Sequence, residues 1–315
     1  MLFDDGANIL ECFVIYAYVL SSFVSFATIW LYRFPQMGNS VFLFRTIFLF
    51  GKCAPNYGRI YTVLQVPKRF FVHFYVTAVI VSLSTILFVL HCHSKRLEEK
   101  FNAIAVMLWQ FCCTGSSIGA NIGLFVMFCH ALKRLYENLY VHLFSDSKMS
   151  IAHYFIGHFF YLTMSPCIYW SSQYAGYSTT AILLDFILDK RGMVAIIAYI
   201  FLAFLTMALQ HLVMRQLAST RLRASKGYSF LERRNAYLMP EGYMFTYVTC
   251  PHFSLEITLY MLTHAFLGLR WMPFTAVLLF VLSNQLCSAV INHLWYLENY
   301  PKFAQSRKML IPFVL

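Results

Sequence analysis

The sequence predicts an all-α protein that crosses a membrane about seven times. Of its 315 residues, 60% are hydrophobic and 18% aromatic, and the mean hydropathy is +0.62. Only 12% are charged, whereas a soluble domain averages about 25%. Seven apolar segments are each long enough to cross the hydrocarbon core of a bilayer. We therefore expect a single membrane domain over residues 1–315, without a separate soluble module.

The expected spans follow one another along the whole chain. They cover roughly residues 8–32, 70–92, 103–129, 151–174, 193–214, 252–269 and 272–295. The sixth is short and is interrupted by Glu256 and His264. No internal repeat is visible, although many transporters are built from repeated halves. Most motifs lie in the part from about residue 103 to residue 315.

The distribution of basic residues orients these spans. The loops 33–69, 130–150 and 215–251 and the tail after 295 hold 18 of the 24 Lys and Arg residues. The positive-inside rule puts these loops and the C-terminus in the cytosol and the N-terminus in the lumen. The acidic start Met1–Gly6 lacks the basic region of a signal peptide, so we expect the first span to remain as an anchor. No basic run is dense enough to indicate nucleic-acid binding, and no obligate protein partner is evident.

Polar groups gather around the last two spans. The loop Tyr237–His252 leads into an apolar segment that contains Glu256, and the tail Asn292–Phe313 is rich in polar and aromatic residues. Ionisable groups inside a span are costly, so they are functional candidates by default. His252 lies four residues before Glu256. Because residues four apart share a helical face, we expect a hydrogen-bonded pair between the two.

A second cluster lies after the third span. His130, Lys133, Arg134 and Glu137 have the i, i+3, i+4, i+7 spacing of one helical face. A solvated ion pair at a helix end, worth a few tenths of a kcal/mol, is an alternative explanation. A basic face also suits a polyanionic ligand such as a dinucleotide, and arginine binds phosphate with two donors. The arginine candidates, each also explained as a topology signal, are Arg134, Arg215, Arg221, Arg223 and Arg307.

Several cofactor sites are excluded by missing patterns. No GxGxxG follows a strand, so a Rossmann site is not expected. The nine cysteines form no CxxC pair, and histidine pairs such as His91/His93 and His153/His158 lack the spacing of a membrane di-iron hydroxylase. We therefore expect no metal, and a dinucleotide would bind between transmembrane helices.

The C-terminal motifs resemble those of the steroid 5α-reductase family. The family's loop reads roughly IPxGGxFxYVSxPNYxxE and its tail roughly HxxYLxxFxxYPxxRKALIPF, against YLMPEGYMFTYVTCPH and NHLWYLENYPKFAQSRKMLIPF here. An HxxKRxxExLxVHxxS block, shared with enoyl-CoA reductases, begins at His130. The segment VPKRFFVHFY, residues 66–75, looks like the polyprenal reductase branch. The resemblance covers about residues 60–315.

This resemblance implies a reductase of the endoplasmic reticulum membrane that uses NADPH. The implied reaction is reduction of an α,β-unsaturated carbonyl on a polyisoprenoid lipid, which feeds dolichol synthesis and protein N-glycosylation. The proton donor is expected among His73, Tyr75 and His130, with Glu137 in the same catalytic group. Besides Arg134 and Arg215, the motifs assign cofactor binding to Tyr237, Gly242, His252, Glu256, His293, Tyr296 and Arg307.

The sequence departs from the family pattern at several of these positions. Tyr243 stands where the family has a second glycine, which removes backbone freedom from the loop. His252 replaces an asparagine, and it keeps the ability to donate and accept a hydrogen bond but also titrates. Phe303 and Ala304 replace the Tyr-Pro of the tail.

Two other classes of function remain open from the sequence. A steroid 5α-reductase or a trans-2-enoyl-CoA reductase would have the same fold. The steroid enzymes carry a Gln-Glu pair that this chain lacks, and the absence of an N-terminal soluble domain counts against the enoyl-CoA enzyme. A seven-span receptor or small carrier would match the number of spans, but its ligand pocket would face outward, whereas the polar groups here cluster on the cytosolic side.

Overall fold

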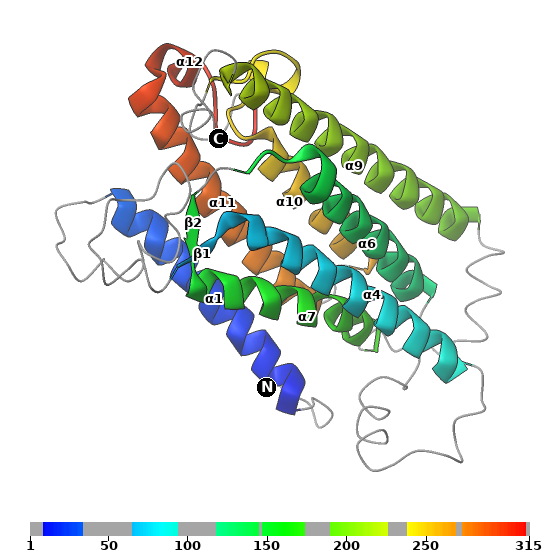
Figure 1. The fold of residues 1–315 in the computed structure, drawn as a ribbon. Helices are drawn as coiled ribbons and strands as arrows, with labels where there is room; N and C mark the ends of the chain where they lie inside the picture. The colour runs from blue at the N-terminus through cyan, green and yellow to red at the C-terminus, as the bar shows by residue number, and fades with distance from the viewer. Residues whose placement is uncertain are drawn as a thin grey trace.

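The computed structural model describes residues 9–33, 65–93, 118–144, 147–173, 190–225, 238–268 and 273–312. Seven long helices account for most of these residues (Figure 1), which confirms the predicted all-α fold. They are α1 (Ile9–Arg33), α4 (Phe71–His93), α6 (Ile118–Tyr136), α7 (Ile151–Gln173), α9 (Lys190–Ser225), α10 (Pro251–Phe266) and α11 (Pro273–Asn299).

Each predicted span overlaps one of these helices. For the third span, residues 103–117 lie outside the described residues, and α6 continues beyond residue 129 to Tyr136. Within the described part of the chain, three helices are long and apolar enough to cross a membrane: Lys68–Val89, Gly192–Ala224 and Pro273–Asn299. The chain is therefore a polytopic α-helical membrane protein.

Short elements connect the helices near the functional residues. Strand β1 (Gln65–Pro67) pairs antiparallel with β2 (Lys148–Ser150), and the turn η4 (Lys68–Phe70) follows β1. A π-helical turn, η5 (Glu137–Val141), ends α6. The turn η7 (Tyr243–Thr246) precedes α10, and α12 (Pro301–Gln305) follows α11.

Two aromatic side chains show how the helices pack. Tyr18 of α1 is buried, and its hydroxyl bonds Thr163 of α7 at 2.5 Å while its ring contacts Phe280 of α11. Phe74 of α4 lies against Gly157 of α7, where an added Cβ would come within 2.8 Å of the ring. Gly157 therefore permits the close approach of α4 and α7, because any side chain would displace the phenyl group.

The loop before α10 is held by the C-terminal tail. The backbone N–H groups of Thr249 and Cys250 donate to the carbonyls of Lys308 and Met309 at 2.9 and 3.0 Å. Arg307 Nε donates to the Phe245 carbonyl at 2.7 Å. These bonds explain why the two C-terminal motifs, far apart in sequence, form one structural unit beside the start of α10.

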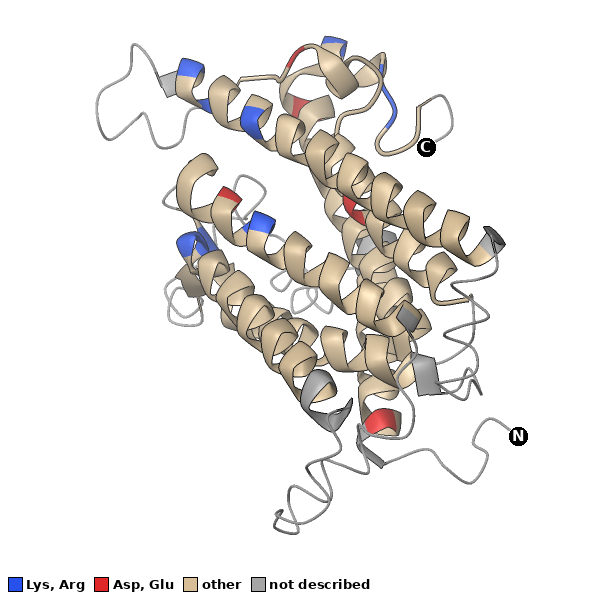
Figure 2. Ribbon diagram, turned by 90° about the vertical axis from the view of Figure 1, so that its right-hand side faces the viewer, with Lys and Arg blue, Asp and Glu red and all other residues tan. Residues whose placement is uncertain are grey.

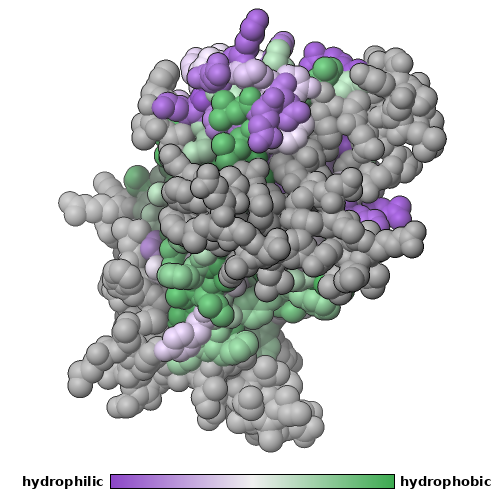
Figure 3. Space-filling view, turned by 90° about the vertical axis from the view of Figure 1, so that its left-hand side faces the viewer, coloured by the Kyte–Doolittle hydropathy of each residue, from purple (hydrophilic) through white to green (hydrophobic). Residues whose placement is uncertain are grey.

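The polar and apolar surfaces are segregated. The end of α9, the start of α10 and α12 meet at one end of the molecule, close to the C-terminus (Figure 1). Figure 2 shows described Lys and Arg residues at this end and at the start of α4. Seen from the side of α1, hydrophilic side chains lie at the α12 end and apolar side chains lie below them (Figure 3). This segregation suits a bundle whose long sides face lipid.

A candidate active site between the helices

A cavity of about 350 Å³ opens between α4, η5, α9, α10 and α11. This volume is in the usual range for small-molecule sites. Its polar lining combines cations, histidines, tyrosines and amides from η4, α4, α6, the loop after η5, α9, α10 and α11. The polar residues that line the cavity include Lys68, Tyr75, Arg134, His142, Arg221, His252, Asn284, Gln285, Ser288, Asn292 and Tyr296.

Glu137 is the centre of an ion-pair cluster beside this cavity. Its side chain is fully buried and lies 2.6 Å from Arg134 Nη1 and 3.1 Å from Lys133 Nζ. His211 of α9 completes the cluster, with Nδ1 3.0 Å from the same carboxylate. The predicted helical face is thus confirmed, but it is not a solvated helix end. One buried carboxylate faces two cations, which makes the cluster dependent on that single negative charge.

Arg134 connects this cluster to Tyr75. Its Nη2 donates a 2.9 Å hydrogen bond to the Tyr75 hydroxyl oxygen, and its guanidinium carbon lies 5.1 Å from the centre of the tyrosine ring. Since the hydroxyl oxygen accepts this bond, its own hydrogen remains available for another acceptor. Tyr75 lines the cavity, so its hydroxyl is placed to donate to a ligand there.

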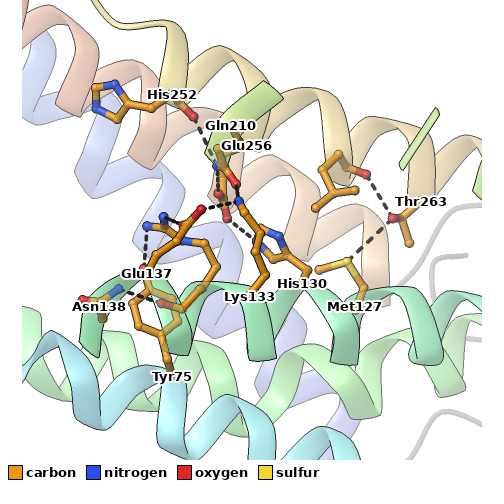
Figure 4. A network of polar contacts seen from close by, with 12 residues as sticks. Tyr75, Met127, His130, Lys133, Glu137, Asn138, Gln210, His252, Glu256 and Thr263 are labelled. Atoms are coloured by element: carbon orange, nitrogen blue, oxygen red, sulfur yellow. Dashed lines mark hydrogen bonds and ion pairs between the residues drawn. The ribbon is translucent and has the colours of Figure 1, made fainter. Parts of the chain in front are cut away.

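Glu256 belongs to a second buried network, shown in Figure 4. Its Oε1 lies 3.1 Å from His130 Nε2, and its Oε2 accepts a hydrogen bond from Gln210 Nε2 at 2.5 Å. The other end of the Gln210 side chain accepts a bond from Lys133. Gln210 thus joins the Glu256–His130 pair to the Glu137 cluster, and one polar network connects α4, α6, α9 and α10.

The predicted pairing of His252 with Glu256 is wrong. The His252 ring points away from Glu256 in Figure 4, and the His252 backbone carbonyl accepts a hydrogen bond from Gln210 at 3.4 Å. His130, from a helix 126 residues away in sequence, occupies the position that was assigned to His252. His252 instead lines the cavity. Its position just inside Pro251, the first residue of α10, directs the ring to that side.

The electrostatic field at the cavity is positive. His142, in the loop after η5, is half-buried, and burial is the main cause that lowers its pKa to about 3. The charges of Arg134, Lys68 and Arg221 lower this pKa further, and the charge of Glu137 raises it. Arg134, Lys68 and Arg221 thus act on one region, and the nearby acid, Glu137, already pairs with Arg134. This environment suits an anionic ligand.

The other predicted residues fall in different places. His73 is exposed, bonds Tyr154 at 2.9 Å and does not line the cavity; Arg215 is also exposed and away from it. His293 and Arg307 line a separate hollow of about 620 Å³ between the loop and the tail. Arg307 uses its guanidinium there to bond the Phe245 and Phe303 carbonyls, which fixes the tail.

Three of the predicted loop and tail residues complete this comparison. Tyr237 lies outside the described residues. Gly242 has φ +82°, and both its carbonyl and that of Glu241 accept bonds from Gln216. Tyr296 lines the main cavity. Of the assigned cofactor residues, the structure therefore brings Arg134, His252 and Tyr296 to the cavity and places Glu256 in the network behind it.

Two features were missed from the sequence. The first is Gln210, which lies among apolar residues of the fifth predicted span. An isolated amide within a span itself indicates a functional or structural role. The second feature is a row of polar residues on the cavity side of α11, with i, i+4, i+8 spacing through residues 284, 288 and 292. This row continues to Tyr296 and is accompanied by Gln285.

Comparisons with known proteins show the family of this chain. Residues 147–315 match the family described as 3-oxo-5-alpha-steroid 4-dehydrogenase. A polyprenal reductase of Caenorhabditis elegans is 30% identical over 260 residues, which cover 80% of each chain. The chain belongs to the steroid 5α-reductase family. Polyprenal reductases of Drosophila melanogaster (27%, covering 80% of this chain and 77% of the relative) and Danio rerio (27%, covering 87% and 88%) are also similar, which places it in the polyprenal reductase branch.

Membership of the steroid 5α-reductase family makes the chain an oxidoreductase and points to a nicotinamide cofactor. The cavity residues fit such a group. Lys68, Arg134 and Arg221 supply cations for phosphates. The Nε of Arg134 is buried and has no hydrogen-bond partner among the described residues. A buried donor without a partner is costly, and a phosphate oxygen would satisfy it.

Proposed function

We propose that the chain reduces the α-isoprene double bond of a polyprenal with NADPH. The observation that carries this proposal is the Tyr75 hydroxyl, which lines a positively charged cavity and accepts a bond from Arg134. The similarity to polyprenal reductases supports the substrate class. The product would feed dolichol synthesis and protein N-glycosylation in the endoplasmic reticulum.

Each part of the site has a role in this reaction. When bound, NADPH supplies a hydride for the β-carbon of the enal. As negative charge develops on the carbonyl oxygen, Tyr75 donates a hydrogen bond to it. Arg134 stabilises the electron-rich Tyr75 oxygen, and Glu137 holds the Arg134 guanidinium in place. The resulting enolate takes a proton from water at its α-carbon, which completes the saturated aldehyde.

Lys68, Arg134 and Arg221 would hold the phosphates of NADPH, with His252 and Tyr296 beside it in the same cavity. The pair Glu256–His130 and the Gln210 amide would fix the packing of α10 against α6 and α9, and so the shape of the cavity. These three residues are positioning residues in this proposal.

The substrate would bind from the membrane. A polyprenal has one polar atom, its carbonyl oxygen, and an apolar tail that stays in lipid. The outer faces of α4 and α9 are apolar, with Ile80 58% and Phe201 64% exposed, and such surfaces contact lipid tails. The basic ends of the helices would lie in the cytosol, where NADPH is available.

The test is NADPH oxidation by the full-length protein purified in detergent, with a polyprenal as substrate and identification of the product by mass spectrometry. Tyr75→Phe is expected to lower kcat by about 10²–10³-fold, because it removes the hydrogen-bond donor to the developing negative charge on the carbonyl oxygen. Glu256→Gln tests the supporting network, and Glu298→Gln, an exposed carboxylate on α11, is the matched control. A 3-oxo-Δ4-steroid and a trans-2-enoyl-CoA are the competing substrates, and faster turnover of either would replace the proposed substrate.

A further inference from the structure

The cavity side of α11 carries a polar row that the proposed reaction does not yet use. Asn284, Gln285 and Ser288 lie in the middle of a helix that is long and apolar enough to span a membrane. All three line the cavity. Polar residues within a span are rare and usually serve a function.

Asn284 and Gln285 differ from the other polar residues of this helix. Asn292 donates to the Ser288 carbonyl at 2.8 Å, and Ser283 donates to the Phe280 carbonyl at 2.9 Å. By contrast, the amides of Asn284 and Gln285 make no hydrogen bond with the described part of the chain. Each amide offers two N–H donors and one carbonyl acceptor. In a partly buried site such groups are costly unless a ligand satisfies them.

These two amides lie at the opposite end of the polar row of α11 from Tyr296. Asn284 precedes Tyr296 by 12 residues of helix α11, which is about 18 Å at 1.5 Å per residue. Arg221 comes from the end of α9, which lies near the end of the bundle where α11 finishes (Figure 1). The polar lining therefore extends from Arg221 and Tyr296 to the amides of Asn284 and Gln285, which suits an elongated ligand with a phosphate near Arg221.

The chemistry of the amides identifies the group that they fit. A polyprenal carbonyl only accepts hydrogen bonds, and Tyr75 already provides a donor for it. Two amides together both donate and accept, which is the complement of a primary carboxamide. We infer that Asn284 and Gln285 bind the carboxamide of the nicotinamide ring and so fix which end of NADPH lies deepest in the membrane. This inference rests on the proposed use of NADPH.

The test compares binding of two oxidised cofactors to the full-length protein in detergent by isothermal titration calorimetry. One is NADP⁺, and the other is its 3-acetylpyridine analogue, which has a methyl group in place of the carboxamide NH₂. Wild type is expected to bind NADP⁺ about tenfold more tightly, the equivalent of one well-formed hydrogen bond. Asn284→Leu and Gln285→Leu are each expected to weaken NADP⁺ binding about tenfold and to remove this preference.

Two controls separate the possible failures. Adenosine 2′,5′-bisphosphate, which lacks the nicotinamide half, is expected to bind all these variants as it binds wild type, which shows that they are folded. Asn299→Ala, at the exposed end of the same helix, is expected to change nothing. A preference for NADP⁺ that survives in both leucine variants would overturn this inference alone. Absence of NADP⁺ binding by wild type would overturn the proposed cofactor, and the inference with it.

Discussion

Loss of the Glu137 charge is expected to destabilise the protein strongly. In Glu137→Gln the side chain keeps its shape, but Arg134 and Lys133 lose the carboxylate that lies 2.6 and 3.1 Å away. At about 3 Å and an effective dielectric constant of about 20, each attraction is roughly 5 kcal/mol. The cost of burying the charges offsets much of this, and removal of one partner of a buried pair typically costs about 3–5 kcal/mol. We expect the free energy of unfolding to fall by about 3 kcal/mol or more.

The assay is reversible unfolding of the purified protein in mixed detergent micelles, followed by circular dichroism. Glu298→Gln, which removes an exposed carboxylate from α11, is the control and is expected to change stability by less than about 0.5 kcal/mol. The double variant Glu137→Gln/Lys133→Met is expected to recover part of the loss, because one uncompensated cation is removed as well. Equal stability of Glu137→Gln and Glu298→Gln would refute the assignment of a buried, charge-dependent cluster.

Three further perturbations have defined outcomes. Tyr243 has φ +47° and is 78% exposed, so Tyr243→Gly is expected to stabilise the protein by about 1 kcal/mol in a thermal unfolding assay, because glycine adopts this conformation without strain. Gly157→Ala places a Cβ 2.8 Å from the Phe74 ring and is expected to cost about 1–3 kcal/mol in the same assay. The pKa of His142 is lowered to about 3 in the folded protein, so below about pH 6.5 the unfolded chain binds a proton at this histidine and the folded chain does not. The free energy of unfolding is therefore expected to fall by about 2 kcal/mol between pH 8 and pH 5. His142→Gln should lack this component when stability is measured against pH.

The sequence predicted correctly those features that depend on one segment alone, namely the positions of the helices and the residues that share a helical face. Hydropathy located the helices because burial in lipid requires a continuous apolar stretch. The face that contains Lys133, Arg134 and Glu137 followed from helical periodicity, since residues three and four apart are neighbours whatever the rest of the fold does.

Hydrogen-bond partners that come from distant segments could not be predicted in this way. Glu256 was paired with His252 because the two are four residues apart, whereas the packing of α6 and α9 against α10 brings His130 and Gln210 to it. No local pattern encodes which helices become neighbours. Arg307 shows a related limit. An arginine in the C-terminal motif suggests phosphate binding, whereas its bond to the Phe245 carbonyl depends on how the tail folds back.

At Tyr243 the sequence motif and the backbone conformation together identify a strained residue. The sequence has a tyrosine where the family pattern that it resembles has a glycine, and the backbone there has the positive φ that glycine favours. The departure of Tyr243 from the motif therefore corresponds to backbone strain, which the Tyr243→Gly variant would measure.

The most direct test of the proposed reaction is the fate of deuterium from NADPH labelled at the transferred position of C4. The purified wild-type protein is incubated with this cofactor and a polyprenal, and the product is analysed by mass spectrometry and NMR. We predict one deuterium on the β-carbon of the α-isoprene unit and an intact aldehyde. Deuterium on the carbonyl carbon, with the double bond retained, would show a carbonyl reductase instead, and an unlabelled product would contradict hydride transfer from NADPH.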